Sequence, residues 1–326
     1  MGLGRLTRRQ YLCLVGAGFA AWPLAVAARR KPAAARVRKI GFLTLDNADT
    51  EFFLKGLMAA LRDLGFGEAA LHVEVRSAEN ATGILALAAE LMALKVDLIF
   101  AFQTPAAVAT KQAVHEIPVV FLAADPVASG LVESLSRPGG NVTGVSAATS
   151  ELAAKNLELV RELLPKLKRV AVLATEDDPL RPTFIERIEA AAKPLDVEVS
   201  AVMLRPGGAI DSSVEAALQK AEAILVQPSI AKQPVAELAL KLRLPAVSPN
   251  PSFVNAGGLA SYSADFGEVP RRCAAMIVAI LKGNQPATLP VELPDKYWLV
   301  LNLKTSKQLS LDIGPSLQLR ADQLIE

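Results

Sequence analysis

The feature that constrains the fold most is a strand–helix order that the chain runs through twice. Between residues 39 and 124, four apolar runs alternate with three helical patterns, and the same alternation returns between residues 168 and 249. Runs such as KIGFLTL and VDLIFAF are continuously apolar, which is typical of strands buried on both faces of a parallel sheet. The sequence therefore predicts an α/β fold with two doubly wound parallel-sheet lobes.

Chain breakers mark the places where the chain is expected to leave one lobe for the other. RPGGNVTGVS (137–146) sets turn-forming residues before a short β-branched strand, and GGLASYSADF (257–266) leads to a lone helix at 271–282. A return from that helix to the second lobe gives a third connection, so we predict a three-segment hinge. The predicted domains are 37–145 plus 263–289 for lobe 1 and 146–262 plus 290–326 for lobe 2.

The first 27 residues have the layout of a cleavable secretory signal. A charged start precedes an apolar run, and Ala25-Val26-Ala27 forms a small-residue cleavage site. The segment Thr7-Arg8-Arg9 also matches a twin-arginine export signal, although the general export route stays open. An uncleaved anchor is the alternative. We expect residues 1–27 to be removed and the mature protein to be periplasmic.

Charge and cysteine content exclude several classes of function. The formal charge of the chain is +2, but Arg5, Arg8 and Arg9 lie in the first 27 residues, which hold no acidic residue, so the rest is slightly acidic. That balance leaves no nucleic-acid footprint. Cys13 and Cys273 have no Cys or His at metal-ligand spacing, so we expect neither a disulfide nor a metal. No nucleophile elbow, phosphate loop or zinc-protease motif supports catalysis.

Long segments of the chain, in a fixed order, resemble a known family. They are LAAELMALKVDLIFAFQTPAAVATKQAVHEIPVVFLAADPVASGLVESLSRPGGNVTGVS, ELAAKNLELVRELLPKLKRVAVL, RLPAVSPNPSFVNAGGLASYSADF and ILKGNQPATLPVELPDKYWLVLNLKTSKQLSLDIGPSLQLRADQLIE. They are similar to substrate-binding proteins of bacterial ABC transporters, in the branch with a type I periplasmic-binding fold that binds tryptophan and related amino acids. The family usually has glycine at positions 103 and 263, where this chain has Gln103 and Ser263.

The resemblance implies a function. A protein of this family is an exported, cofactor-free monomer that captures a small molecule between its lobes and delivers it to an ABC transporter permease in the inner membrane. Two alternatives stay open from the residues themselves. The first is an exported α/β enzyme acting on a small molecule with paired carboxylates, and the second is a sensor that presents the bound ligand to a membrane receptor.

The general geometry of parallel α/β sheets predicts where the site lies. Ligands bind beyond the carboxyl ends of the strands, and two hinged sheets would face those ends across one cleft. The candidates are therefore polar residues in the loops that follow strands. In chain order they are Thr44, Asp46 and Asn47; Gln103 and Thr104; Asp125; Thr175, Glu176 and Asp177; Gln227 and Ser229; and Ser248 and Asn250.

One of these loops opens a helix. Thr104 is a favoured N-cap and Pro105 a favoured first helical residue, so we expect the amides of Ala106 and Ala107 to point out of the helix start. An anion is stabilised at such a place, and a ligand carboxylate would fit there. A plain helix cap without a ligand is the equal alternative.

Acidic residues are the candidates for a ligand ammonium. A carboxylate and a desolvated cation make a charge-assisted hydrogen bond, and Asp125, Asp177 and Asp265 are each possible partners. Each also fits an ordinary turn or capping role. Tyr262 is predicted to stack on the ligand or, alternatively, to pack in the hinge. We predict a small zwitterion, an amino acid with an apolar side chain, with its ammonium at Asp265.

Overall fold

The computed structural model describes residues 36–326 except 46–48, 79–80, 206–209 and 266. The predicted export signal and Asn47 lie outside the described residues. The folded unit runs from Arg38 to Glu326 and, over its described part, contains two β-sheets. Within that part no helix is long and apolar enough to cross a membrane.

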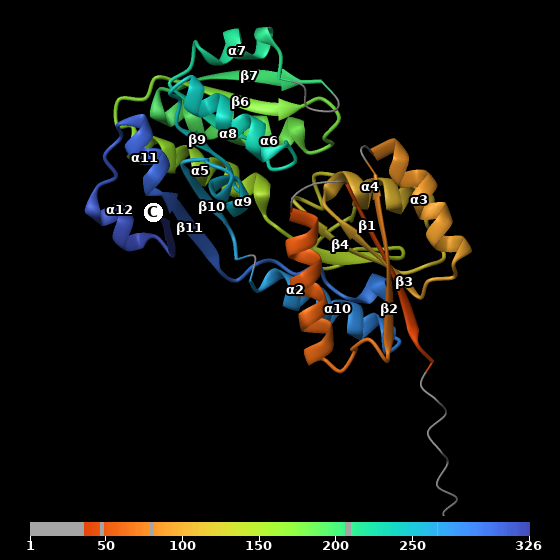
Figure 1. Ribbon diagram of the computed structural model, residues 1–326. Helices are drawn as coiled ribbons and strands as arrows, with labels where there is room; N and C mark the ends of the chain where they lie inside the picture. The colour runs from red at the N-terminus through yellow and green to blue at the C-terminus, as the bar shows by residue number, and fades with distance from the viewer. Residues whose placement is uncertain (1–35, 46–48, 79–80, 206–209, 266) are drawn as a thin grey trace, which may run out of the picture. The chain divides into compact units, whose positions relative to one another are not determined.

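The first sheet holds five parallel strands in the order β2-β1-β3-β4-β5 among the described residues. These are β1 (Arg38–Leu45), β2 (Leu71–Ala78), β3 (Leu98–Phe102), β4 (Val119–Ala123) and β5 (Val142–Ser146). The helices that pack on it are α2 (Asp49–Asp63), α3 (Ala81–Ala93), α4 (Thr104–Ala113) and α10 (Val269–Leu281). In Figure 1 the blue α10 lies beside the orange α2, so the late helix returns to the first sheet.

The second sheet has the order β12-β11-β10-β9-β8-β6-β7. Its strands are β6 (Arg169–Thr175), β7 (Glu198–Leu204), β8 (Ala223–Val226), β9 (Ala246–Val247), β10 (Ala260–Ala264), β11 (Tyr297–Asn302) and β12 (Gln323–Ile325). Its helices are α5 (Thr149–Leu163), α6 (Arg181–Ala192), α7 (Ser212–Leu218), α8 (Lys232–Lys241), α9 (Pro251–Asn255), α11 (Leu303–Leu309) and α12 (Pro315–Arg320). Short 3-10 turns, η1 (Lys193–Leu195) and η2 (Pro286–Thr288), complete the described elements.

The inner strands of both sheets are buried on both faces, as their continuous apolar runs predict, whereas the edge strands β2, β7 and β12 keep exposed residues. In β1, Phe42 packs in the core that contains α2 and α10, while its neighbour Leu43 packs in the core that contains α3 and α4. In β6, Val172 and Leu173 divide in the same way between the α5–α6 side and the α7–α8 side. Each such side chain contributes about 1.5–3 kcal/mol when fully buried, so the two layers of helices stabilise each sheet.

The glycines of the segment RPGGNVTGVS have two different structural roles. Gly139 and Gly140 have φ of 75° and 57°, a backbone that favours glycine and turns the chain into β5. Gly144 lies inside β5, where an added Cβ would stand 2.2 Å from the carbonyl oxygen of Phe121 on β4. The turn glycines therefore start the strand, and Gly144 lets it approach its neighbour.

The chain passes between the two sheets at three places. It leaves β5 of the first sheet for α5 of the second around 147–148, returns from β10 to α10 around 265–268, and leaves again for β11 around 293–296. Before the last passage Glu292 forms a parallel bridge with Val145 of β5. In the sequence, the first passage directly follows the predicted hinge segment 137–146, the second overlaps the segment 257–266, and the third comes after the predicted lone helix.

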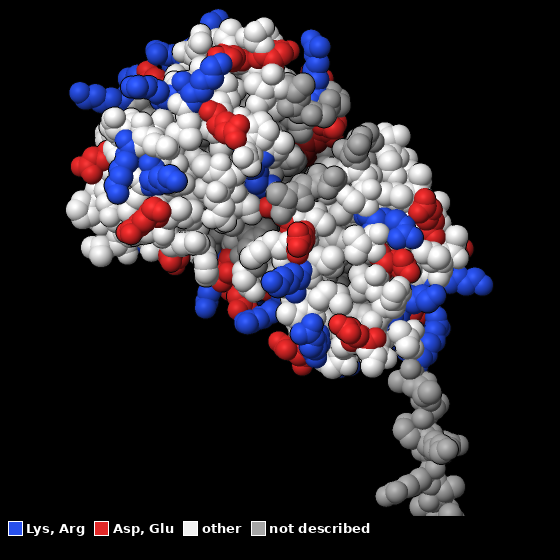
Figure 2. Space-filling view, in the orientation of Figure 1, with Lys and Arg blue, Asp and Glu red and all other residues white. Residues whose placement is uncertain are grey.

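The α/β class with two doubly wound sheets is confirmed, with one addition that the sequence analysis did not contain. Strand β11 runs antiparallel to β10, and β12 is parallel to β11, so the second sheet is mixed at this edge. Because β11 enters after a passage from the first sheet rather than through a crossover helix, it is free to run in the opposite direction. On the face drawn in Figure 2, acidic and basic side chains are interspersed, in keeping with the small net charge.

Candidate functional site

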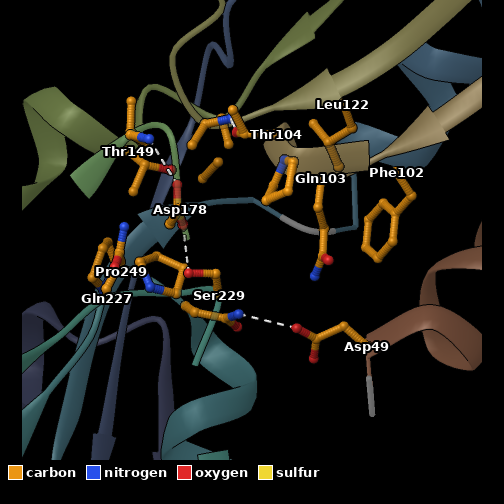
Figure 3. A pocket seen from close by; sticks show the side chains of 17 residues that line it. Asp49, Phe102, Gln103, Thr104, Leu122, Thr149, Asp178, Gln227, Ser229 and Pro249 are labelled. Atoms are coloured by element: carbon orange, nitrogen blue, oxygen red, sulfur yellow. Dashed lines mark hydrogen bonds between the residues drawn. The ribbon is translucent and has the colours of Figure 1, made fainter. Parts of the chain in front are cut away.

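A cavity opens at the carboxyl ends of the strands of both sheets. Its empty volume is about 680 Å³ with the solvent-facing mouth included. The first sheet and its connections contribute Asp49, Phe102, Gln103, Thr104, Pro105, Leu122, Ala124 and Ala147. The second sheet and its connections contribute Thr149, Asp178, Leu180, Gln227, Pro228, Ser229, Pro249, Asn250 and Ala264. Figure 3 shows these side chains from close by.

A buried carboxylate, Asp178, lies on the second-sheet side. It follows β6, is only 7% exposed, and accepts hydrogen bonds from the Ser229 hydroxyl at 2.5 Å and the Leu180 N–H at 2.8 Å. Burial raises the pKa of this carboxyl above its ordinary value, while the Ser229 and Leu180 hydrogen bonds oppose that rise. Asp178 is therefore a held but poorly solvated acid, a group that a ligand cation would stabilise in its ionised form.

The side-chain amide of Gln227, another lining residue, is fixed by a hydrogen bond. Gln227 is 1% exposed, and its Oε1 accepts a hydrogen bond from Thr175 N–H at 3.0 Å. Its Nε2 is buried and has no hydrogen-bond partner among the described residues. A buried donor without an acceptor is unfavourable, so this N–H is available to an acceptor on a ligand.

Gln103 stands at the end of β3 with an unusual backbone. Its φ of 78° and ψ of 154° fall in a region that is essentially restricted to glycine and costs about 1–3 kcal/mol for other residues. The Gln103 N–H donates to Leu122 C=O at 2.9 Å, and the Gln103 C=O accepts from Ala107 N–H at 3.0 Å, so both sides of the residue are held. Gln103 is also the position where the resembled family usually has glycine.

The start of α4 differs from the predicted cap. The N-cap is Gln103 rather than Thr104, and the Thr104 hydroxyl accepts a hydrogen bond from Ala124 N–H at 2.9 Å instead of capping the helix. The Ala107 amide is satisfied by Gln103, so it is not one of the amides left open. For the Ala106 N–H, the described residues provide no hydrogen-bond acceptor. The helix start still faces the cavity, through Thr104 and Pro105.

A charged cluster links the two sides of the cavity. The first residue of α2, Asp49, forms an ion pair at 2.6 Å with Lys232 of α8, and their side chains are 7% and 9% exposed. The Asn250 amide donates to the same Asp49 oxygen at 3.0 Å, a contact drawn in Figure 3. Asn250 also caps α9 through its Oδ1, which accepts from Ser252 N–H at 2.9 Å. Residues distant in sequence thus join the first-sheet side to the second.

The charged side chains among the described lining residues are all acidic. Asp49 and Asp178 are acidic, and the described lining residues include no Lys, Arg or His. Lys232 neutralises Asp49, which leaves Asp178 as the lining carboxylate without an ion-pair partner in the described structure. No group of His, Cys, Asp and Glu that could hold a metal ion occurs among the residues that were described.

Three of the predicted site residues come together in this cavity: Gln103, Thr104 and Asn250. Of the other candidate loop residues, Gln227 and Ser229 also line it. These five follow strands of both sheets, as the rule for parallel α/β sheets predicts.

Four predicted residues lie outside the lining. Thr44 is fully buried at the end of β1 and donates to Leu45 C=O, and Ala106 is fully buried within α4. Asp125 accepts from Ala128 N–H in the loop after β4. Asp177 is exposed and accepts a hydrogen bond from the Thr175 hydroxyl. The turn and capping alternatives describe the observed contacts of the two aspartates.

Tyr262 and Asp265 lie further along the chain, at the second passage between the sheets. Tyr262 is in β10, is half-buried against the core of the second sheet and stacks on Tyr297 with ring centroids 6.0 Å apart. Asp265 lines a separate cavity with Arg272 and Lys296, and its Oδ1 accepts from Gly267 N–H. The structure therefore does not bring these two side chains to the larger cavity.

Asp49, Asp178 and Lys232 were not among the residues predicted from the sequence. Asp178 follows Asp177, and an Asp-Asp pair before a proline gives no sign of which carboxyl turns inward. Asp49 opens a helix, where an acidic residue is commonplace, and Lys232 opens another, where a lysine opposes the helix dipole. A search for charged residues at helix starts that follow strand ends would have found both.

Comparison with known proteins places this cavity in a family context. The profile of the ABC transporter substrate binding proteins matches residues 43–325. The chain belongs to this family. Its fold is that of the type I periplasmic binding proteins.

Similar proteins with stated ligands include binders of aromatic amino acids. A "Tyrosine-binding protein" of Clostridioides difficile (strain R20291) is 27% identical over 264 residues, which cover 79% of this chain and 76% of that protein. An ABC domain from Streptococcus pneumonia, solved in complex with L-Trp, is 27% identical with a TM-score of 0.83, covering 89% of this chain and 100% of that one. A conserved domain protein of Vibrio cholerae, 23% identical with a TM-score of 0.81 and the same coverage, shows the fold alone.

Proposed function

We propose that this protein captures an amino acid in the cavity between its two sheets, without chemical turnover, and delivers it to an ABC transporter permease. The observation that carries the proposal is Asp178, a buried carboxylate with no basic residue beside it in the described lining. Such a group suits the ammonium of a zwitterion. The family membership and the amino-acid ligands of the similar proteins support the same class.

The two ends of a zwitterion would meet different sides of the cavity. The α-ammonium lies at Asp178, which its Ser229 and Leu180 hydrogen bonds hold in place. The α-carboxylate lies at the start of α4, where Thr104 and Pro105 line the cavity and the positive end of the helix dipole favours an anion. Phe102, Leu122 and Leu180 provide apolar surface for the remainder of the ligand.

Calorimetry with a panel of amino acids on the mature chain tests the ligand class. We expect at least one amino acid to bind, and Asp178→Asn to weaken its affinity by about 30-fold or more, because removing one side of a buried charged hydrogen bond costs about 2–5 kcal/mol. Failure of every amino acid to bind would sink the proposal.

Asp265→Asn is the matched control, and it also tests the ammonium site expected from the sequence. Asp265 is as buried as Asp178, at 6% exposure, but lines the other cavity. We expect this variant to bind within about twofold of the parent. A large loss with Asp265→Asn and none with Asp178→Asn would move the ammonium to Asp265.

Export is part of the proposed function and rests on the first 27 residues of the sequence. The Ala25-Val26-Ala27 site predicts cleavage, and the Arg8-Arg9 pair favours the twin-arginine route. Replacing both arginines by lysine should stop the mature protein from reaching the periplasm. Normal periplasmic amounts would exclude that route and leave the general one.

A further inference from the structure

Two glutamines occupy equivalent positions in the two sheets. Strand β3 lies next to β1 in the order β2-β1-β3, and β8 lies next to β6 in the order β7-β6-β8. Gln103 directly follows β3 and Gln227 directly follows β8. Each backbone N–H donates to a carbonyl of a neighbouring strand at 2.9 Å, Gln103 to Leu122 and Gln227 to Leu173. Both side chains line the same cavity, one from each sheet.

The Gln227 amide can only donate. Its Oε1 is occupied by Thr175 N–H at 3.0 Å, and that bond directs the buried Nε2, which has no acceptor among the described residues. A buried donor without an acceptor destabilises the protein unless a bound molecule accepts its hydrogen. The Gln227 Nε2 therefore favours a ligand with an oxygen or nitrogen acceptor at this place.

The Gln103 amide can both donate and accept. It is half-buried, and no hydrogen bond joins its side chain to another described residue. In Figure 3 its amide end extends into the open space of the cavity, away from β3. The glycine-like backbone, held by Leu122 and Ala107, keeps the Cα–Cβ bond in that direction.

We propose that Gln103 and Gln227 are the specificity-determining pair of this site, and that they select an amino acid whose side chain carries a hydrogen-bonding group. This inference rests on the proposed function and refines it. In the proposed function the α-carboxylate is bound at α4 and the α-ammonium at Asp178. The two glutamine amides are therefore left to contact the side chain of the ligand. A ligand hydroxyl or amide can satisfy both, because each can accept from the Gln227 Nε2 and donate to the Gln103 Oε1.

The physical basis is the penalty for a ligand that lacks the polar group. A hydrocarbon side chain of equal shape would bury the Gln227 Nε2 and the Gln103 amide without partners. Sites built to hydrogen-bond a polar group reject the analogue without it far more strongly than apolar pockets separate two hydrocarbons. The expected preference is about tenfold or more in affinity.

Matched ligand pairs test the proposal by calorimetry on the mature chain. The pairs are L-tyrosine with L-phenylalanine and L-glutamine with L-methionine. In the pair that binds most tightly, we expect the polar member to bind about tenfold or more tightly than its apolar counterpart. Affinities within threefold of each other in that pair would overturn the proposal.

Variants then assign the preference to the two residues. Gln103→Ala removes one amide, and Gln227→Glu keeps an oxygen for Thr175 N–H while removing the buried donor. Each should bring the preference below threefold, and Gln103→Ala should do so by weakening the polar member alone. Gln308→Ala, an exposed glutamine of α11, is the control and should leave the preference unchanged. Thermal unfolding checks that each variant is folded.

The outcomes separate this inference from the proposed function. If no amino acid binds, the proposed function fails and the pair has nothing to select. If amino acids bind and the preference persists in Gln103→Ala and Gln227→Glu, the proposed function stands and the specificity pair is wrong.

Discussion

The two walls of the cavity orient their polar groups by different means. On the second-sheet wall, Asp178 and Gln227 are held by side-chain hydrogen bonds from Ser229 and Thr175. On the first-sheet wall, Gln103 is directed by its strained backbone, and its side chain makes no hydrogen bond to a described residue. The second wall is pre-organised in its side chains, whereas the first wall is pre-organised in its main chain.

This difference separates two tasks within one site. On the second wall the fixed acid, Asp178, suits the ammonium that all amino acids share, and the fixed donor of Gln227 suits an acceptor at one defined place on the ligand side chain. A side chain with a held Cα but a movable amide suits a part that varies between ligands. The walls meet at the Asp49–Lys232 ion pair, which connects the first to the second.

Removing the link between the walls should have the largest effect. In Lys232→Met the Asp49 carboxylate would lose its cation at a buried position, a change that costs about 3–5 kcal/mol if the closed arrangement is kept. We expect the lobes to separate instead, with ligand affinity falling by about 100-fold and the ligand-free protein expanding in solution scattering.

Lys241→Met on the same helix is the control. Lys241 pairs with Glu215 but its side chain is 65% exposed, and exposed pairs contribute little. Its affinity should stay within about twofold of the parent. Equal losses in the two variants would show that the buried pair does not hold the walls together.

Acidification should weaken binding through Asp178 on the second wall. Burial raises the pKa of this carboxyl above its ordinary 3.8, so the folded protein binds the proton more tightly than the unfolded chain. That contribution to stability is present below pH 3.8 and is lost as pH rises through the raised pKa. A ligand ammonium favours the ionised form, so its affinity should fall, by up to about tenfold per pH unit, below the raised pKa.

Calorimetry over a pH series checks this sign. The parent should lose affinity on acidification, whereas the weaker residual binding of Asp178→Asn should be flat through the same window. A pH dependence that persists in Asp178→Asn would assign the titration to another group.

Relieving the first-wall backbone should have the smallest effect. Gln103→Gly removes about 1–3 kcal/mol of backbone strain from the folded protein. Against this, the greater conformational freedom of glycine in the unfolded chain destabilises the folded state by about 0.5–1 kcal/mol. We expect a net gain of about 1 kcal/mol and a Tm higher by about 2–4 °C in the ligand-free protein.

The equivalent change on the second wall should have the opposite sign. Gln227 has no positive φ, and Gln227→Gly also removes the acceptor of Thr175 N–H, so its Tm should fall. A lower Tm in Gln103→Gly would show that the backbone at Gln103 is not strained.

Much of the fold was predictable from local pattern. Continuous apolar runs and helical spacing placed most strands and helices of both sheets, because burial on two faces leaves its mark on every residue of a strand. The same pattern located the strand ends, and therefore Gln103, Gln227 and Asn250 as candidates. The local pattern could not predict that β11 is antiparallel, because the direction of a strand depends on where the chain re-enters the sheet.

The sequence by itself determined the α/β class, the two sheets and the edge at which the cavity opens. Only the tertiary structure decided that Asp178 rather than Asp177 lines the cavity, that Lys232 reaches Asp49, and that Tyr262 packs against a core. The physical reason is that periodic burial is a property of each segment alone. The direction of a loop side chain, by contrast, follows from a backbone angle and from partners that only the folded chain brings within hydrogen-bonding distance.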